Sequence, residues 1–305
     1  MIINKIIILN ATLGISLHLK PSTIQEEEMF NPIYKQKGLS SNELSFDTKN
    51  KLFDSCLRSL FALPGEISNL TTNKICRNVK HLNKCYSVNN EPIFHGEYLA
   101  SRPKAKRILV IALIHGDEIE SGSVARHWMA RLQRINSRST WRIIPVLNPD
   151  GLKRKTRTNQ NRVDLNRNFP TANWNTQAIE YWKKKKKSNG RHYPGPYPSS
   201  EPETTCAINH ISDFKPDFII SIHTPYGVLD FDGPKINFPK FKEYPWVSLG
   251  TFPGSLGRYM WTDRQIPVLT VELRNSQFLS KLDRIDVLQD TLGTVAIKAN
   301  NKVEK

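Results

Sequence analysis

The chain has 305 residues, 38% of them hydrophobic, so it is long enough to bury a substantial core and its composition excludes an intrinsically disordered protein. No stretch is long and apolar enough for a membrane-spanning helix, so we expect no membrane span. The formal net charge of +16 favours anionic partners, but a solvated basic surface carries the same charge, so charge alone identifies no partner.

Residues 1–22 carry one early lysine and then a short apolar run that Asn10, Thr12 and Ser16 interrupt. This pattern is acceptable as the core of a secretory signal, although no clear cleavage site follows it. We therefore interpret residues 1–22 as a signal or leader and expect a periplasmic or secreted protein. A cytoplasmic location is the alternative.

Residues 23–97 are expected to form a partly irregular N-terminal segment. The stretch 20–50 is polar and rich in turn residues, as in a linker, and the apolar spacing within 51–64 predicts a helix.

Four cysteines are present, and three of them lie in this segment: Cys56, Cys76 and Cys85, with Cys206 further on. In an exported protein a disulfide within the first three is expected, and four cysteines permit several pairings. Buried reduced thiols in a cytoplasmic protein are the alternative.

Residues 98–300 alternate between apolar strands and helices. Strands are expected at RILVIALI, WRIIPVLNPDG, DFIISIH and VLTVEL, and helices at EIESGSVARHWMARLQRI and SSEPETTCAINHISDF. This alternation predicts an α/β catalytic domain with a mixed, mostly parallel central sheet flanked by helices.

Two local features of this domain are predicted from residue type. Ser200 is expected to cap the second helix, with Pro202 in its first turn and Glu203 completing a capping box. The lysine-rich stretch 183–190 is expected to be a solvated loop, and we expect no nucleic-acid partner.

Polar groups follow the predicted strands at the points where those strands end. HGDE follows the first strand, NPDG follows the second, His223 ends the third and Glu272 lies near the end of the fourth. Ligands of open α/β sheets bind outside the carboxyl ends of the strands, so these groups are expected to converge.

A zinc hydrolase commonly uses three protein ligands and leaves a fourth position for water. His115, Glu118 and His223 fit such a set, with one His-x-x-Glu pair and one distant histidine. Glu272 is the candidate general base and acid, because an ionisable group that closes an apolar strand is unusual. Arginines then have two tasks, polarising a carbonyl and binding a carboxylate.

These motifs, taken together and in order, resemble the zinc metallocarboxypeptidase family. They are HGDE, NPDG, R-x-N-x-x-x-DLNRNFP, SEPET, a strand-ending histidine and ELR, and they extend from about Ile108 to Asn275. The resemblance implies a metallopeptidase with one Zn²⁺ per chain, held by His115, Glu118 and His223, and with Glu272 as catalytic base and acid.

The resemblance also implies substrate-binding residues. Asn166 and Arg167 of DLNRN match the pair that binds the terminal carboxylate of the substrate. The carbonyl-polarising arginine is expected in RKTR, where its distance to DLNRN favours Arg157 and the alternative is Arg154. Tyr259 has no motif that identifies it as the mobile tyrosine of the digestive enzymes.

Within the family, the chain length and HTPYGVLDFDGP are similar to the bacterial murein peptide amidases. That subgroup hydrolyses the γ-D-glutamyl–meso-diaminopimelate amide, so we expect an anionic murein peptide as substrate. Asp230 and Asp232 are candidate partners of the distal amine of diaminopimelate, or simply turn residues.

Two alternatives share the scaffold: a carboxypeptidase for ordinary L-amino acids and an N-acyl amino acid deacylase. The full DLNRNFP string argues against the deacylase. A non-catalytic binder of peptidoglycan or nucleic acid is the alternative from another class, and the intact set of ligands with Glu272 argues against it. The oligomeric state is left open.

Overall fold

A computed structural model describes residues 46–241, 243–274 and 281–303 of the chain. The expected leader and most of the expected linker lie outside these residues. No helix in the described ranges is long and apolar enough to cross a membrane.

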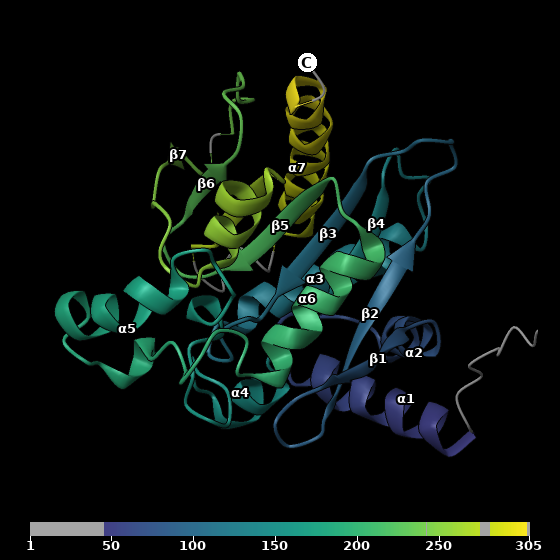
Figure 1. Cartoon of the computed structure of the whole chain (residues 1–305). Helices are drawn as coiled ribbons and strands as arrows, with labels where there is room; N and C mark the ends of the chain where they lie inside the picture. The colour runs from purple at the N-terminus through teal and green to yellow at the C-terminus, as the bar shows by residue number, and fades with distance from the viewer. Residues whose placement is uncertain (1–45, 242, 275–280, 304–305) are drawn as a thin grey trace, which may run out of the picture. The chain divides into compact units, whose positions relative to one another are not determined.

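One mixed sheet runs through the described residues, in the order β1-β2-β4-β3-β5-β8-β6-β7 (Figure 1). Its strands are β1 Lys80–Tyr86, β2 Pro92–Tyr98, β3 Arg107–Ala112, β4 Thr140–Ile144, β5 Phe218–His223, β6 Val228–Asp232, β7 Trp246–Val247 and β8 Val268–Glu272. The central strands β4, β3, β5 and β8 are parallel, and antiparallel pairs extend the sheet on both sides. The predicted α/β class with a mixed, mostly parallel sheet is confirmed.

Helices cover both faces of the sheet. They are α1 Phe46–Phe61, α2 Asn69–Arg77, α3 Ile119–Leu132, α4 Pro149–Arg154, α5 Trp174–Lys185, α6 Pro202–Phe214 and α7 Leu282–Val303, with short helical turns η1 Leu165–Arg167, η2 Gly190–His192 and η3 Arg258–Thr262. In Figure 1, α6 lies across the near face of the sheet, and α3 and α7 lie behind it.

The side chains of β3 divide the interior into two cores. Val110 packs on the α3 and α7 side with Trp128 and Leu292, whereas Leu109 packs on the α6 side with Ile211. Successive side chains of a strand point to opposite faces, and residues 108–112 of β3 are all apolar and buried, so this strand is covered on both faces. Helices packed on both faces hold the parallel strands, and therefore the positions of their carboxyl ends.

The N-terminal segment is held by two disulfides and by the pairing of its strands with the sheet. Helix α1 is joined to α2 by a disulfide between Cys56 and Cys76, which lies within the predicted group of three cysteines. Cys85 pairs instead with Cys206, which joins β1 to α6. Strands β1 and β2 are hydrogen-bonded into the central sheet, and the proposed division at residue 97 stays a prediction.

Two local predictions are wrong. Ser200 does not cap α6, because its hydroxyl donates to Glu201 and accepts from Asn168, and Glu201 occupies the N-cap position. The lysine stretch 183–190 is not wholly a loop, since residues 183–185 form the last turn of α5. Lysines there are favourable, because the C-terminal end of a helix attracts positive charge.

Candidate active site

The sheet brings the predicted site residues to one edge. His223 is the last residue of β5 and lies directly opposite Glu272, the last residue of the parallel strand β8. His115 and Glu118 follow β3, the neighbour of β5 on its other side. Three parallel strands therefore end at the same place, each with an ionisable group of the predicted site.

His115, Glu118 and His223 form a cluster whose ligand atoms all lie within 4.8 Å of one another. Glu118 Oε1 lies 2.7 Å from His115 Nδ1, and Glu118 Oε2 lies 2.9 Å from His223 Nδ1. The two Nδ1 atoms are 3.2 Å apart. All three residues are buried.

This donor set fits zinc. Two imidazole nitrogens and one carboxylate are the ligands of many catalytic zinc sites, which keep one position open. Burial opposes the charge of Glu118, but His115 and His223 lower the pKa of this carboxyl well below its usual range, so it is ionised and able to coordinate a cation. The ligand atoms of three buried polar side chains thus face one another, and a metal ion between them would satisfy all three.

Asp164 and Ser221 orient the two histidines from behind. Asp164 Oδ1 lies 3.2 Å from His115 Nε2, and the Ser221 hydroxyl lies 2.9 Å from His223 Nε2. Partners of this kind fix the ring orientation of metal-binding histidines. The sequence analysis missed both residues. Asp164 begins the DLNRN motif, and Ser221 faces the same side of its strand as His223, so spacing carries a signal for each.

The HGDE and NPDG turns pack against each other. A side chain at Gly116 would place its Cβ 2.1 Å from the backbone of Gly151, which no substituent can tolerate. Asn148 accepts a hydrogen bond from Gly151 N and donates to the carbonyl oxygen of Ile114. The NPDG turn therefore supports the turn that carries His115.

Of the two candidate arginines, Arg157 lies in the site. Its guanidinium contacts Asp164 at 3.0 Å and Glu118 at 3.4 Å, and the residue lines the same pocket as the histidine–glutamate cluster. Arg154 is exposed at the end of α4, and it donates to the backbone and side chain of Gln160 outside the pocket. The geometry favours Arg157 over Arg154 for the polarising role, which stays a prediction.

Arg167 and Asn166 also line the pocket. The Arg167 guanidinium stacks 4.6 Å from the ring centroid of Phe252, and its Nε has no hydrogen-bond partner although it is buried. No described carboxylate forms an ion pair with it, and burial lowers its pKa. Asn166 Oδ1 accepts from Leu256 N at 2.9 Å, which fixes the orientation of the amide. A buried, unpaired guanidinium is a natural partner for a carboxylate.

Glu272 lies in the pocket with one carboxylate oxygen, Oε2, buried and without a hydrogen bond. Burial is the main cause that raises its pKa, His223 opposes this effect, and the nearby Glu118 adds to it. A carboxyl group whose pKa is raised towards neutrality suits proton transfer in both directions.

The pocket has a volume of about 480 Å³. On the side formed by β6 it is lined by Asp230 and Asp232, neither of which forms an ion pair with a described cation. Burial raises the pKa of Asp230, and burial together with Asp230 raises the pKa of Asp232 to about 7. Both residues belong to a strand and not, as the alternative had it, to a turn alone.

Tyr259 lies outside this pocket. It is buried in η3, where its ring packs against Phe169 and beneath the guanidinium of Arg264. The position therefore offers no phenol to a substrate in this structure.

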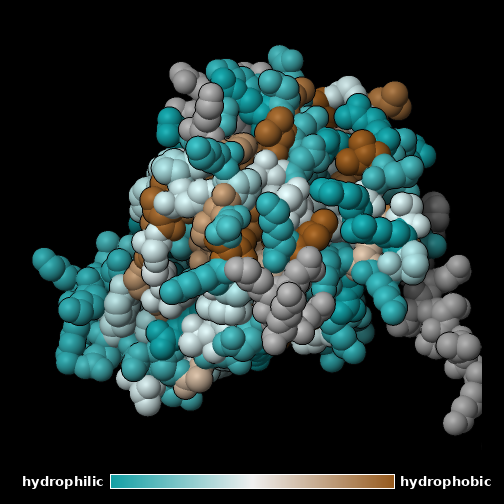
Figure 2. Space-filling model, turned by 90° about the horizontal axis from the view of Figure 1, so that it is seen from above, coloured by the Kyte–Doolittle hydropathy of each residue, from teal (hydrophilic) through white to brown (hydrophobic). Residues whose placement is uncertain are grey.

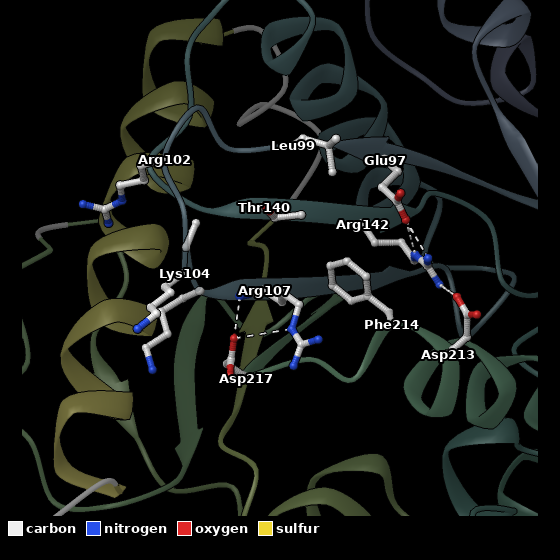
Figure 3. A pocket seen from close by; sticks show the side chains of 12 residues that line it. Glu97, Leu99, Arg102, Lys104, Arg107, Thr140, Arg142, Asp213, Phe214 and Asp217 are labelled. Carbon is white, nitrogen blue, oxygen red and sulfur yellow. Dashed lines mark hydrogen bonds and ion pairs between the residues drawn. The ribbon is translucent and has the colours of Figure 1, made fainter.

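A second hollow of about 640 Å³ lies near the amino end of β3, away from the cluster (Figure 3). Its charges largely pair with each other: Arg142 binds Glu97 and Asp213, and Arg107 binds Asp217. The face seen in Figure 2 is mainly hydrophilic, with hydrophobic residues in small scattered groups. Neither feature offers a catalytic arrangement.

An α/β sheet that presents a buried histidine–glutamate–histidine cluster, a carboxyl group of raised pKa and two arginines defines a metal-dependent hydrolase of amide bonds. Comparison with known families agrees: the sequence profile described as "Zinc carboxypeptidase" matches residues 74–231. The chain belongs to the zinc carboxypeptidase family.

Individual relatives point in the same direction. Murein peptide amidase A of Vibrio campbellii is 32% identical over 185 residues, which cover 55% of this chain and 69% of that protein. The crystal structure of a murein-tripeptide amidase from Escherichia coli O157 has a TM-score of 0.51 and 26% identity, over 69% of this chain and 91% of that one. Bovine thrombin-activatable fibrinolysis inhibitor, at 18% identity over 77% of this chain and 94% of that one, has a TM-score of 0.57, which supports the fold alone.

Proposed function

We propose that this chain hydrolyses the γ-D-glutamyl–meso-diaminopimelate amide of murein peptides, with one Zn²⁺ held by His115, Glu118 and His223. The observation that carries the proposal is the charge arrangement of one pocket. Beside the candidate metal ligands it combines the Arg167 guanidinium, whose Nη1 donates, among the described residues, only to the carbonyl oxygen of Asn166, with two carboxyl groups on β6 that form no ion pair with a described cation. The similarity to murein peptide amidases supports the same substrate.

The chemistry of the bound ion is general: zinc in such a site polarises a carbonyl and acidifies water. The side chains of this chain supply the remaining steps. Glu272 accepts a proton from the attacking water and then transfers it to the leaving amine, which its raised pKa favours. Arg157 stabilises the negative charge that develops on the carbonyl oxygen.

The pocket has candidate partners for two charged groups at the diaminopimelate end of the peptide. Its carboxylate next to the scissile amide would bind Arg167 and Asn166. Its distal ammonium would bind Asp230 and Asp232, and this positive charge would favour ionisation of both carboxyl groups. Contacts with both the near carboxylate and the distal ammonium would orient this residue as well as bind it.

The alternative within the family is a carboxypeptidase for ordinary L-amino acids. Arg167 and Asn166 would serve that reaction equally well, because every such substrate ends in a carboxylate. What separates the two is the β6 side of the pocket, where Asp230 and Asp232 would disfavour an apolar terminal side chain. A non-catalytic role has no comparable support, because no predicted ligand or base is missing.

We propose export to an oxidising compartment. All four cysteines are paired in the structure, Cys56 with Cys76 and Cys85 with Cys206, and disulfides persist mainly outside the cytoplasm. N-terminal sequencing of the mature protein tests this: removal of a leader near residue 22 supports export, and an intact first residue supports the cytoplasmic alternative.

The substrate is tested by a panel of peptides offered to the zinc-loaded protein. The panel holds L-Ala-γ-D-Glu-meso-diaminopimelate, its L-lysine analogue, an apolar L-amino-acid analogue and an N-acyl amino acid. We expect the highest kcat/KM with the diaminopimelate peptide. Efficient cleavage of the apolar analogue with the tripeptide intact would instead identify an ordinary carboxypeptidase.

A further inference from the structure

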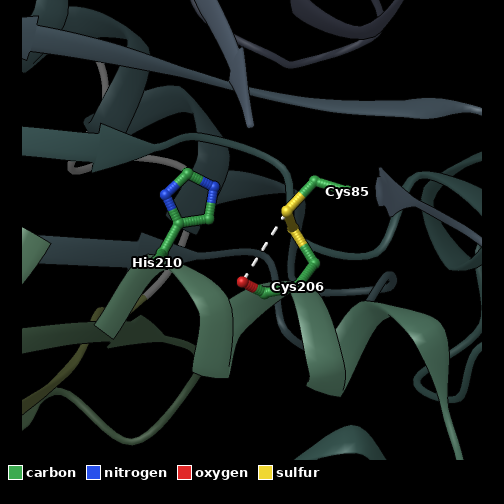
Figure 4. A group of neighbouring side chains, drawn as sticks. All are labelled: Cys85, Cys206 and His210. Atoms are coloured by element: carbon green, nitrogen blue, oxygen red, sulfur yellow. Dashed lines mark hydrogen bonds between the residues drawn. A yellow bond between two sulfur atoms is a disulfide. The ribbon is translucent and has the colours of Figure 1, made fainter. Parts of the chain in front are cut away.

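A second cluster of metal-binding residue types lies on the α6 face of the sheet, apart from the active site. It consists of Cys85 on β1 and of Cys206 and His210, which lie one turn apart on α6 (Figure 4). One ligand atom from each lies within 4.8 Å of the others. All three residues are 0% exposed.

His210 is an unusual buried residue. Neither of its ring nitrogens has a hydrogen-bond partner, although both are shielded from solvent. Burial lowers the pKa of His210 to about 2, so the imidazole is neutral and keeps a lone pair. Buried polar groups in native proteins are almost always satisfied, and an orphan of this kind calls for a water, an ion or a chemical role.

A second histidine stands next to it. The rings of His95 and His210 have centroids 4.7 Å apart at an interplanar angle of 79°, and His95 Nδ1 is also buried without a partner. Burial lowers the pKa of His95 to about 3, so it too is neutral. The region therefore holds two sulfurs and two neutral imidazoles, all of them buried.

We propose that Cys85, Cys206 and His210 form a second, structural metal site when the Cys85–Cys206 disulfide is reduced, with His95, whose ring contacts that of His210, as a candidate fourth ligand. Two thiolates and two imidazoles are a common ligand set of closed, tetrahedral zinc sites, and soft sulfur ligands favour Zn²⁺ over Mg²⁺ or Ca²⁺. The site differs from the catalytic cluster in kind, because the latter contains no sulfur.

Reduction of the Cys85–Cys206 disulfide precedes metal binding. A dithiol reductant gives two electrons and two protons to the sulfur–sulfur bond, which breaks into two thiols, while the dithiol becomes a disulfide. Binding of one Zn²⁺ then releases both thiol protons, and His210 coordinates through a nitrogen that carries none. A disulfide oxidant reverses the change: it accepts two electrons from the two thiolates and two protons from water to become a dithiol, while the Cys85–Cys206 bond forms again and Zn²⁺ is released.

Either state would link β1 to α6, so the cross-link survives a change of redox conditions. This link matters for the active site because the first turn of α6 is hydrogen-bonded to the segment that lies between Arg157 and DLNRN. Glu203 on its first turn accepts from Asn159, which in turn accepts from Val163 N just before DLNRN. The metal would thus hold the same helix end in place that the disulfide holds.

Cobalt tests the proposal on the full-length protein. The protein is reduced with a phosphine, which becomes a phosphine oxide with oxygen from water, then desalted without air and titrated with Co²⁺. Cobalt bound to thiolate absorbs in the near ultraviolet by charge transfer, and the catalytic cluster cannot give this band. We expect two equivalents of Co²⁺ and the band in reduced protein, and one equivalent without the band in oxidised protein.

Two variants show which side chains bind the cobalt that gives the charge-transfer band. His210→Gln keeps both thiols and should weaken the second site by more than the roughly 10–100-fold that loss of an outer partner costs. Cys56→Ser/Cys76→Ser is the matched control, because it removes the other disulfide and should leave the band unchanged. The proposal is overturned if reduced protein binds one equivalent without the band, or if the band follows Cys56 and Cys76.

Discussion

Asp164 Oδ1 lies 3.2 Å from Nε2 of His115, and the other oxygen of the same carboxylate lies 3.0 Å from the guanidinium of Arg157. One buried side chain thus contacts both a candidate metal ligand and the candidate carbonyl-polarising group. Burial opposes its charge, but Arg157 and His115 hold the pKa of Asp164 well below its usual range. Asp164 therefore couples the position of the arginine to that of the metal site.

Replacing Asp164 by Asn removes this charge while keeping the size of the side chain. We expect zinc affinity or activity to fall roughly 10–100-fold, as for other outer partners of metal-binding histidines. Competition with a chromogenic chelator measures the affinity. Asp213→Asn, which removes a carboxylate from the ion pair with Arg142 far from the pocket, is the control. Equal zinc affinity in both variants would contradict the role of Asp164.

Arg157 and Arg154 form a matched pair for mutation, because they are three residues apart, Arg154 at the end of α4 and Arg157 in the loop that follows it. Arg157→Ala should lower kcat about 100–1,000-fold, the cost of removing one group that stabilises a developing oxyanion. Arg154→Ala should change kcat little, because Arg154 is exposed and contacts Gln160. Steady-state kinetics on the tripeptide decides, and a larger effect at Arg154 would reverse the assignment.

Specificity is expected to depend on the carboxyl groups of β6. Asp230→Asn/Asp232→Asn should raise KM for the diaminopimelate tripeptide roughly 10–100-fold, the range for a lost hydrogen bond to a charged group. KM for a peptide that ends in an apolar L-amino acid should stay level or fall. If both values of KM change by the same factor, these residues do not recognise the distal ammonium.

Asp232 is expected to make the free energy of unfolding depend on pH. Its pKa is about 7 in the folded chain against 3.8 as reference, so the folded state binds more protons between these values. The free energy of unfolding should therefore fall as pH rises from about 4 to 7, by roughly 1–3 kcal/mol for this group after allowance for its partial exposure. Asp232→Asn should flatten this part of the profile in urea titrations, and an unchanged slope would refute the shifted pKa.

The site residues that could be predicted from the sequence are those that end or directly follow the parallel strands. After Arg107, RILVIALI is apolar throughout, which predicts a strand covered on both faces, and the carboxyl ends of such parallel strands share one edge of the sheet. On that basis the sequence predicts that His115, His223 and Glu272 lie close together at one edge of the sheet.

Features that depend on tertiary contact were not predictable in this way. The choice between Arg157 and Arg154 depends on how the loop folds back on Asp164, and sequence spacing alone left it open. The pairing of Cys85 with Cys206 spans 121 residues and requires knowledge that α6 lies over β1. Ser200 failed as a cap because Asn168, a distant residue in sequence, engages its hydroxyl.

The most direct test of the account is the release of free diaminopimelate from L-Ala-γ-D-Glu-meso-diaminopimelate by the zinc-loaded protein and by Glu272→Gln. We expect the wild type to release it with one zinc at the catalytic cluster. Glu272→Gln should retain that zinc and lose about 100–10,000-fold in rate, the contribution of a general base and acid. An intact tripeptide with the zinc-loaded wild type, or full activity in Glu272→Gln, would contradict the account.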